Sequence, residues 1–186
     1  MKRIFIAVKI EPGDELKKMI SSLKSSFSNE RIKWVDLVNI HLTLAFLGDT
    51  GEKRLAGLSG LLKNICNGYP AFEFLLSGTG VFKNFRDPRV IWAGIKNSVE
   101  LNELQSLIES GLRSSDFRLS ERHFNPHLTL ARIKSVLDIE NLRKLLLKYS
   151  GTTFQKVPVK EVILFESILR PEGPLYIPLE KYLLGN

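Results

Sequence analysis

The hydrophobic positions of the chain follow two spacings that predict an alternation of strands and helices. Apolar runs rich in β-favouring residues are typical of strands. Apolar residues three and four positions apart are typical of amphipathic helices. The predicted strands are 3–10, 32–35, 41–47, 72–76, 89–96, 127–133, 157–165 and 175–179, and the predicted helices are about 15–27, 52–66, 100–113 and 138–149.

Turn-forming residues delimit these elements. Asp14 is predicted to cap the first helix. Gly48 and Asp49 are predicted to end the strand that begins at 41, and Gly78-Thr79-Gly80 is predicted to be a bulge or a turn. The loop 84–88 is the natural boundary between two halves of the chain.

A five-residue sequence occurs twice. His41-Leu42-Thr43-Leu44-Ala45 recurs unchanged as His127-Leu128-Thr129-Leu130-Ala131, at an offset of 127 − 41 = 86. At the same offset Arg3-Ile4-Phe5-Ile6-Ala7 falls on Arg89-Val90-Ile91-Trp92-Ala93. The order strand, helix, motif strand, helix, strand also appears in each half. We therefore expect one domain, 1–186, made of two pseudo-symmetric halves at about 1–86 and 87–186.

The motif places polar groups where a structural strand would not need them. Side chains of a strand alternate between its faces, so His41, Thr43 and Ala45 share one face, and Leu42, Leu44 and Phe46 the other. The second copy follows the same pattern. If a pseudo-twofold axis relates the halves, both His-Thr faces line one cleft.

A pair of histidines across a cleft suits acid–base chemistry. A histidine exchanges a proton near neutral pH because its unperturbed pKa is about 6.5. A threonine hydroxyl on the same face can hold an oxyanion such as a phosphate oxygen. We therefore regard His41, Thr43, His127 and Thr129 as the candidate site.

Composition and charge narrow the class of protein. The 186 residues are 44% hydrophobic and 25% charged, as in ordinary soluble proteins, and no apolar run approaches the length of about 20 residues that spans a bilayer. The single Cys66 excludes an intramolecular disulfide and is expected to be buried. We expect a cytoplasmic monomer without a signal peptide. The net charge of +7 favours a polyanionic partner, although no basic run indicates a disordered arm.

Two other chemistries fit less well. His123 and His127 are four residues apart, as in helical zinc sites, but Pro126 disfavours a helix there and no cluster of Cys, Asp or Glu lies nearby. We expect no metal and no other cofactor, and we expect His123 to lie in a surface loop. The chain also lacks the Gly-x-Ser-x-Gly sequence of serine hydrolases.

The doubled His-x-Thr motif resembles that of the 2H phosphoesterase superfamily. The flanking residues resemble the RNA 2′,3′-cyclic phosphodiesterase branch, historically called 2′-5′ RNA ligase. These flanks are Arg3-Ile4-Phe5-Ile6-Ala7, Phe46-Leu47-Gly48, Arg89-Val90-Ile91-Trp92-Ala93-Gly94, Asn125-Pro126 and Arg132. The resemblance implies a bilobal α+β fold in which two antiparallel sheets form a central groove, with helices outside.

The resemblance also implies metal-independent hydrolysis of an RNA 2′,3′-cyclic phosphate end to a 2′-phosphomonoester. We expect His127 to be the base and His41 the acid, although the symmetry leaves the reverse open. Thr43 and Thr129 would hold the phosphate oxygens. Arg132 follows the second motif and could meet phosphate, but strict alternation places it on the leucine face, where a surface salt bridge is as plausible. Phe46 could stack on a base, but alternation makes it a core residue.

Other functions remain open at this stage. The partner could be an RNA end such as a tRNA half. The same groove could instead perform 2′-5′ ligation, hydrolyse ADP-ribose 1″,2″-cyclic phosphate or cleave 2′-5′ oligoadenylate. A non-catalytic module that binds RNA ends is the alternative from a different class.

Overall fold

The computed structural model describes residues 1–119 and 123–185. All the predicted helices are present, and so are the predicted strands apart from 157–165. The strands are β1 (Lys2–Lys9), β2 (Arg31–Trp34), β3 (His41–Thr50), β4 (Phe72–Phe82), β5 (Val90–Lys96), β6 (His127–Ser135), β7 (Thr153–Val159), β8 (Glu161–Ile168) and β9 (Leu175–Leu183). The helices are α1 (Asp14–Ser26), α2 (Glu52–Asn67), α3 (Val99–Ser114) and α4 (Ile139–Lys148), with a short 3₁₀ turn, η1 (Leu37–Asn39).

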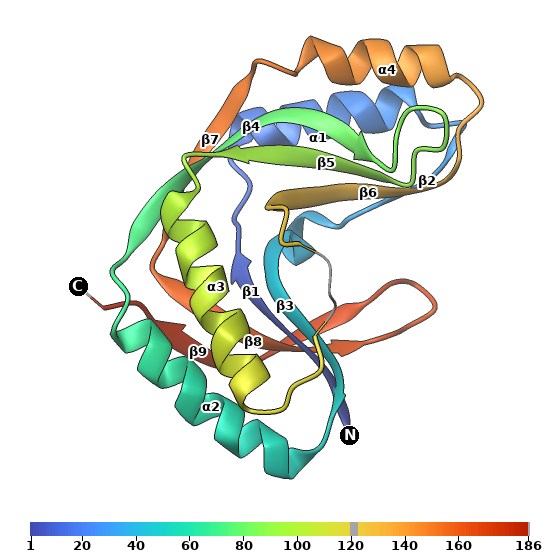
Figure 1. Cartoon of the computed structure of the whole chain (residues 1–186). Helices are drawn as coiled ribbons and strands as arrows, with labels where there is room; N and C mark the ends of the chain where they lie inside the picture. Colours follow the sequence, from blue (N-terminus) through green and yellow to red (C-terminus); the bar gives the residue numbers. More distant parts are fainter. Residues whose placement is uncertain (120–122, 186) are drawn as a thin grey trace.

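The strands form two antiparallel sheets with the helices on their outer sides (Figure 1). The first sheet has the strand order β3-β1-β8-β9, and the second has the order β2-β6-β5-β4-β7. Helices α2 and α3 contact β9 and β3 of the first sheet, while α1 and α4 contact β7 and β4 of the second. This arrangement confirms the predicted α+β fold of two antiparallel sheets with helices outside.

The sheets do not follow the two halves of the sequence. Strand β4 lies before residue 86 but pairs with β5 in the second sheet, and β8 lies after it but pairs with β1 in the first. Helix α1 likewise packs on the second sheet. Each sheet is therefore completed by strands from the other half of the chain.

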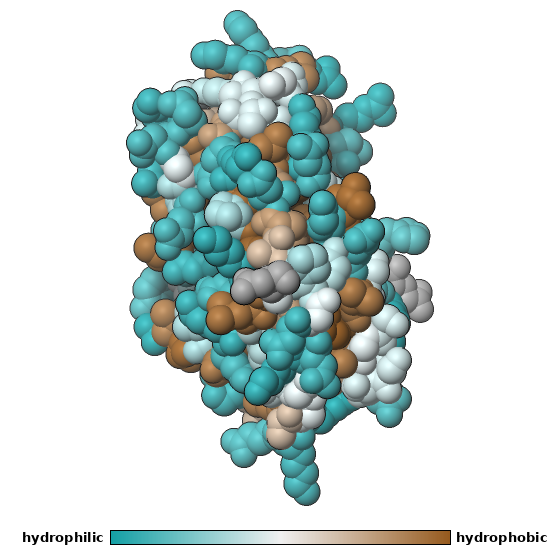
Figure 2. Space-filling model, turned by 90° about the vertical axis from the view of Figure 1, so that its left-hand side faces the viewer, coloured by the Kyte–Doolittle hydropathy of each residue, from teal (hydrophilic) through white to brown (hydrophobic). Residues whose placement is uncertain are grey.

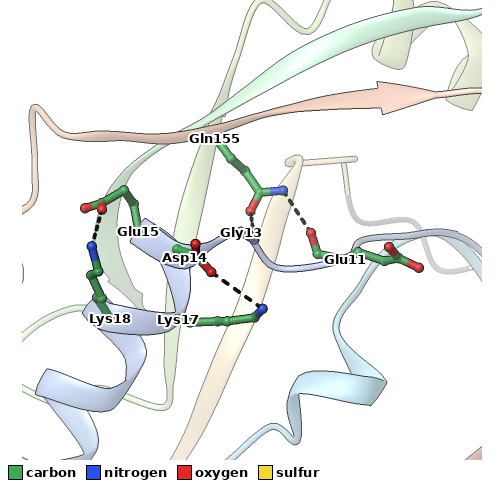
Figure 3. A network of polar contacts seen from close by, with 7 residues as sticks. All are labelled: Glu11, Gly13, Asp14, Glu15, Lys17, Lys18 and Gln155. Carbon is green, nitrogen blue, oxygen red and sulfur yellow. Dashed lines mark hydrogen bonds and ion pairs between the residues drawn. The ribbon is translucent and has the colours of Figure 1, made fainter.

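A glutamine joins the first turn of the chain to the second sheet. The Gln155 side chain of β7 accepts a hydrogen bond from the Gly13 backbone N–H at 2.6 Å and donates one to the Glu11 carbonyl at 3.1 Å (Figure 3). Gly13, and not Asp14, is the N-cap residue of α1, and it provides no side-chain cap. Asp14 instead lies in the first turn of the helix, near Lys17.

Three other boundaries differ from the sequence-based prediction. Strand β3 continues through Gly48 to Thr50, because Gly48 adopts a positive φ of 69° at an irregularity in the pairing with β1. Strand β4 continues past Gly78, where the register with β5 shifts, so that this glycine lies in a bulge. The predicted strand 157–165 is in fact two strands, β7 and β8, which belong to different sheets.

The pairing register also corrects the alignment of the first strands of the two halves. Ala7 pairs with Thr43, and Trp92 pairs with Thr129. Trp92 is therefore equivalent to Ala7, at an offset of 92 − 7 = 85, and the alignment of Arg3 with Arg89 is wrong by one residue. Burial agrees, because the equivalent residues Ile6 and Ile91 are both fully buried.

Two further sequence-based expectations concern the burial of Cys66 and the length of apolar segments. Cys66 is fully buried at the end of α2, as predicted, and burial raises the pKa of its thiol to about 11. Among the described residues, no helix is long and apolar enough to cross a membrane.

Candidate active site

A β-bulge occurs at the same place in both motif strands. The pairing of β1 with β3 runs from Ala7–Thr43 to Ile6–Ala45 and leaves Leu44 without a partner residue. The pairing of β5 with β6 leaves Leu130 unpaired in the same way. These leucines are 130 − 44 = 86 residues apart. A bulge inserts one residue and so reverses the alternation of all the side chains that follow.

The bulges move two side chains to the face of the histidines. Leu44 and Ala45 are both buried, as are Leu130 and Ala131. Phe46 and Arg132 then lie on the His-Thr faces of their strands. The prediction that Phe46 is a core residue is therefore wrong, since it is 48% exposed. The assignments of Arg132 to the leucine face and of Ala45 to the histidine face are wrong for the same reason.

The two His-Thr faces line one groove of about 730 Å³ between the sheets. The structure brings together every residue of the predicted site, namely His41, Thr43, His127, Thr129 and Arg132. Their strands, β3 and β6, approach each other across the groove. His123 is exposed and is not among the described residues that line this groove.

Both histidines are held by the same local hydrogen bond. The Nδ1 atom of His41 lies 2.7 Å from the carbonyl oxygen of Asn39, and that of His127 lies 2.7 Å from the carbonyl oxygen of Asn125. A carbonyl oxygen can only accept, so Nδ1 carries the proton and donates it. Nε2 is therefore the nitrogen of each ring that remains available to exchange a proton with a substrate.

The surroundings of the two rings differ. The His41 ring centroid lies 4.9 Å from that of Phe5 and 5.0 Å from that of Tyr176. Burial lowers the pKa of His41 below its ordinary value, against the opposing effect of the hydrogen bond to Asn39. The His127 ring meets Phe82 edge-on at 4.7 Å. Thus equivalent motif residues have different aromatic surroundings.

The groove carries an excess of positive charge. Arg3, Lys33 and Arg132 line it together with the acidic Asp36 and Glu172. The Arg3 guanidinium carbon lies 5.0 Å from the centroid of the Phe46 ring, a cation–π contact that leaves both groups at the groove wall. Guanidinium groups, threonine hydroxyls and imidazoles together suit an anionic phosphate ester.

The sequence pattern did not identify three of these groove residues. Arg3 was noted only as part of the repeat. Lys33 lies at the groove because β2 pairs with β6, where Lys33 is opposite Arg132. Tyr176 comes from β9, distant in sequence from both motifs, and no local pattern connects it with them. Among residues 1–119 and 123–185, no group of three or more His, Cys, Asp or Glu side chains could hold a metal ion.

Known proteins share this fold and sequence. The family model described as LigT like Phosphoesterase matches residues 6–92 and 95–176. A protein of Methanothermobacter thermautotrophicus named RNA 2′,3′-cyclic phosphodiesterase is 34% identical over 184 residues, which cover 98% of each chain. A protein of the same name from Archaeoglobus fulgidus is 32% identical, over 97% of this chain and 99% of its own.

Solved structures agree with these sequence matches. The protein TT0787 of Thermus thermophilus has a TM-score of 0.79 and 28% identity, over 99% of both chains. Escherichia coli LigT in complex with 3′-AMP has a TM-score of 0.78 and 26% identity, over 100% of this chain and 99% of its own. With its doubled His-x-Thr motif, its two-sheet groove and these matches, the chain belongs to the LigT-like phosphoesterase family of the 2H superfamily.

Proposed function

We propose that the protein hydrolyses 2′,3′-cyclic phosphate ends of RNA to 2′-phosphomonoesters. The observation that carries this proposal is the pair of histidines in one groove, each with Nδ1 bound to a backbone carbonyl and Nε2 available for proton exchange. The relatives named RNA 2′,3′-cyclic phosphodiesterase support it.

The reaction needs one proton acceptor and one proton donor. His127 takes a proton from a water molecule, whose oxygen forms a new bond to phosphorus. The bond from phosphorus to the 3′-oxygen breaks, and His41 donates a proton to that oxygen. Thr43, Thr129 and Arg132 hold the non-bridging phosphate oxygens, whose negative charge increases in the transition state.

The asymmetry of the groove supports this choice of acid and base. Phe46 offers an exposed ring for stacking a nucleobase, and it lies on the same strand as His41. The nucleoside and its 3′-oxygen then lie on the side of His41. Because attacking and leaving oxygens are roughly in line, the water enters from the opposite side, where His127 lies.

The surface fits a partner that binds in the groove. Figure 2 shows one outer face of the molecule, on which hydrophilic residues predominate and apolar residues form separate small areas. Such scattered apolar residues are normal on monomers. We propose that the protein acts as a monomer, in the cytoplasm, on RNA ends such as those of tRNA halves.

The first experiment tests the reaction and its need for metal. The purified protein is incubated in excess chelator with a short RNA that ends in a 2′,3′-cyclic phosphate. We expect rapid formation of a 2′-phosphate end. Binding of the RNA without turnover would contradict the proposal and would favour a module that only binds RNA ends.

A substrate with a sulfur leaving group then distinguishes the catalytic acid from the catalytic base. His41→Ala and His127→Ala should each lower kcat by about 10²–10⁴-fold. A cyclic substrate with sulfur in place of the bridging 3′-oxygen has a leaving group that needs no proton. We expect this substrate to restore turnover by His41→Ala but not by His127→Ala. If this substrate restored turnover only in His127→Ala, His127 would be the acid and His41 the base.

A further inference from the structure

Tyr176 lines the groove but has no role in the reaction described above. Its ring meets the His41 ring edge-on, with the centroids 5.0 Å apart and an angle of 82° between the two planes. It also meets the Phe5 ring edge-on, at a centroid distance of 5.0 Å. Edge-to-face contacts of this kind are favourable arrangements of aromatic rings. The two contacts hold the ring of Tyr176 in place, and they therefore fix the direction in which its hydroxyl group points.

The hydroxyl group of Tyr176 has no partner within the described part of the protein. It forms no hydrogen bond with any of the described residues, whereas the hydroxyl groups of Tyr69 and Tyr182 each donate to a protein oxygen at 2.8 Å. Nor is its oxygen enclosed in the core. Among the described residues, the Trp92 indole nitrogen is the only buried side-chain nitrogen or oxygen without a partner. The hydroxyl of the half-buried Tyr176 is therefore free to donate to a ligand in the groove.

The other motif histidine shows that packing alone does not require this hydroxyl. The ring of Phe82 meets His127 edge-on, with a centroid distance of 4.7 Å and an angle of 88°. This is close to the geometry in which Tyr176 meets His41. A phenylalanine thus supports an imidazole of the same motif without any hydroxyl group. The oxygen of Tyr176 is not needed to hold His41 in place, and a contact with substrate accounts for it better.

Two guanidinium groups act on the same hydroxyl. The charges of Arg132 on β6 and Arg3 on β1 lower the pKa of Tyr176, although burial outweighs them and leaves it above its ordinary value. The phenol therefore keeps its proton near neutral pH and can donate it in a hydrogen bond. Neither guanidinium forms a hydrogen bond or an ion pair with any of the described residues. Unpaired donors that gather in this way suit an oxyanion.

We propose that Tyr176 is a further catalytic residue, whose hydroxyl group donates a hydrogen bond to a non-bridging oxygen of the cyclic phosphate. The inference rests on the proposed function, in which Thr43, Thr129 and Arg132 hold the same oxygens. These oxygens gain negative charge as the water molecule attacks, so the hydrogen bond is stronger in the transition state than in the bound substrate. The phenol lowers the barrier of the chemical step without taking up or releasing a proton.

The variant Tyr176→Phe tests the hydroxyl alone, because it keeps the ring beside His41 and Phe5. The substrate is a short RNA that ends in a 2′,3′-cyclic phosphate. We expect kcat to fall about 10²-fold, the scale of one lost oxyanion donor, and KM to change less than about threefold. Full activity of the variant would overturn the inference. Failure of the unmodified protein to hydrolyse this RNA would instead overturn the proposed function.

A second measurement shows whether the hydroxyl contacts the phosphate itself. Sulfur replaces one or the other non-bridging oxygen, which gives two diastereomeric substrates. Because sulfur is a weak acceptor, the unmodified protein should hydrolyse one diastereomer more slowly for lack of this hydrogen bond. In Tyr176→Phe the bond is already absent, so the losses caused by sulfur and by the variant should not add for that diastereomer. Additive losses for both diastereomers would show that the hydroxyl does not contact a non-bridging oxygen.

The pH profile excludes an indirect effect through His41. The alkaline fall of kcat/KM should occur at the same pH in Tyr176→Phe as in the unmodified protein, because the ring still buries the imidazole. A fall that moves to another pH, together with additive sulfur effects, would mean that Tyr176 acts only through His41 and would overturn the inference.

The matched control is Tyr149→Phe. Tyr149 lies at the end of α4, is half-buried, and is not among the described residues that line the groove. Its hydroxyl likewise forms no hydrogen bond with any described residue. We expect this change to alter neither kcat nor the response to sulfur. Losses equal to those of Tyr176→Phe would show that the place of the hydroxyl in the groove is not what matters, which would also overturn the inference.

Discussion

His41 and His127 share a sequence motif and the same kind of hydrogen bond, but they pack against different aromatic rings. The ring of His41 packs against the rings of Phe5 and Tyr176, and its burial lowers its pKa. A proton donor must be protonated when the reaction begins. The lowered pKa of His41 therefore affects the pH dependence of the reaction.

The profile of kcat/KM against pH should fall on its alkaline side below pH 6.5. That profile reports the free protein, in which a His41 with a depressed pKa loses its proton below the ordinary value of about 6.5. A bound phosphate anion favours the protonated ring, so the alkaline limb of kcat should lie at higher pH. Steady-state kinetics from pH 4 to 9 measures both limbs.

A variant provides the control for this assignment. Tyr176→Ser opens the His41 ring to water, which should raise its pKa and move the alkaline limb of kcat/KM to higher pH. An alkaline limb that stays in place in this variant would show that another group loses the proton.

At the residue scale, the sequence alone predicted that the two histidines and the two threonines lie together, because they recur within a five-residue repeat, and all four line the groove. It did not identify the orientation of Phe46 and Arg132. Both follow a bulge, and a bulge arises from pairing with another strand, which the local sequence does not reveal.

At the scale of the elements, the carbonyl groups of the two bulges are satisfied in different ways. Strand β2 lies beside β6, and the Val35 backbone N–H donates to the Leu130 carbonyl at 2.9 Å. Strand β3 is instead at the edge of its sheet. The side-chain amide of Gln105, a buried residue of α3, donates there to the Leu44 carbonyl at 3.5 Å and to Glu109 at 2.9 Å.

Gln105→Met should therefore affect both stability and activity. It keeps the length of the side chain but removes the donor, so we expect the free energy of unfolding to fall by about 1 kcal/mol. We also expect kcat/KM to fall several-fold, because Thr43 adjoins the bulge. Denaturant unfolding and steady-state kinetics measure these effects.

The matched control is Asn102→Met, an exposed change on the same helix. It should leave both quantities unchanged. A loss of stability by Gln105→Met at full activity would limit Gln105 to a structural role.

The predicted strand 157–165 shows that a local hydrophobic pattern does not reveal which sheet a strand belongs to. Val157, Val159, Val162 and Leu164 are all buried, so hydrophobicity alone predicts a single strand. The chain nevertheless passes from the second sheet to the first at Lys160. No glycine or asparagine marks this passage, and only the closure of both sheets determines it.

At the scale of the whole molecule, few polar contacts join the turn before α1 to the second sheet, and Gln155 makes two of them (Figure 3). Gln155→Leu leaves the Gly13 N–H and the Glu11 carbonyl without this partner. We expect the free energy of unfolding to fall by about 2 kcal/mol, since unpaired, partly buried polar groups cost about 1–3 kcal/mol each. Urea denaturation measures this loss.

Activity and a neighbouring variant complete this test. We expect kcat/KM to stay within twofold, because Gln155 is not among the described residues that line the groove. Lys156→Leu breaks an exposed ion pair with Glu73 and should cost less than about 1 kcal/mol. Equal losses from the two changes would show that the Gln155 contacts do not stabilise the fold.

The exchange of strands between the halves makes each half depend on the other for folding. Strand β4 completes the sheet of β5 and β6, and β8 completes the sheet of β1 and β3. Each half on its own would therefore leave one edge of its first strand without a partner, β1 without β8 or β5 without β4. Separate expression of 1–86 and 87–186 should then yield fragments that fold only when they are mixed.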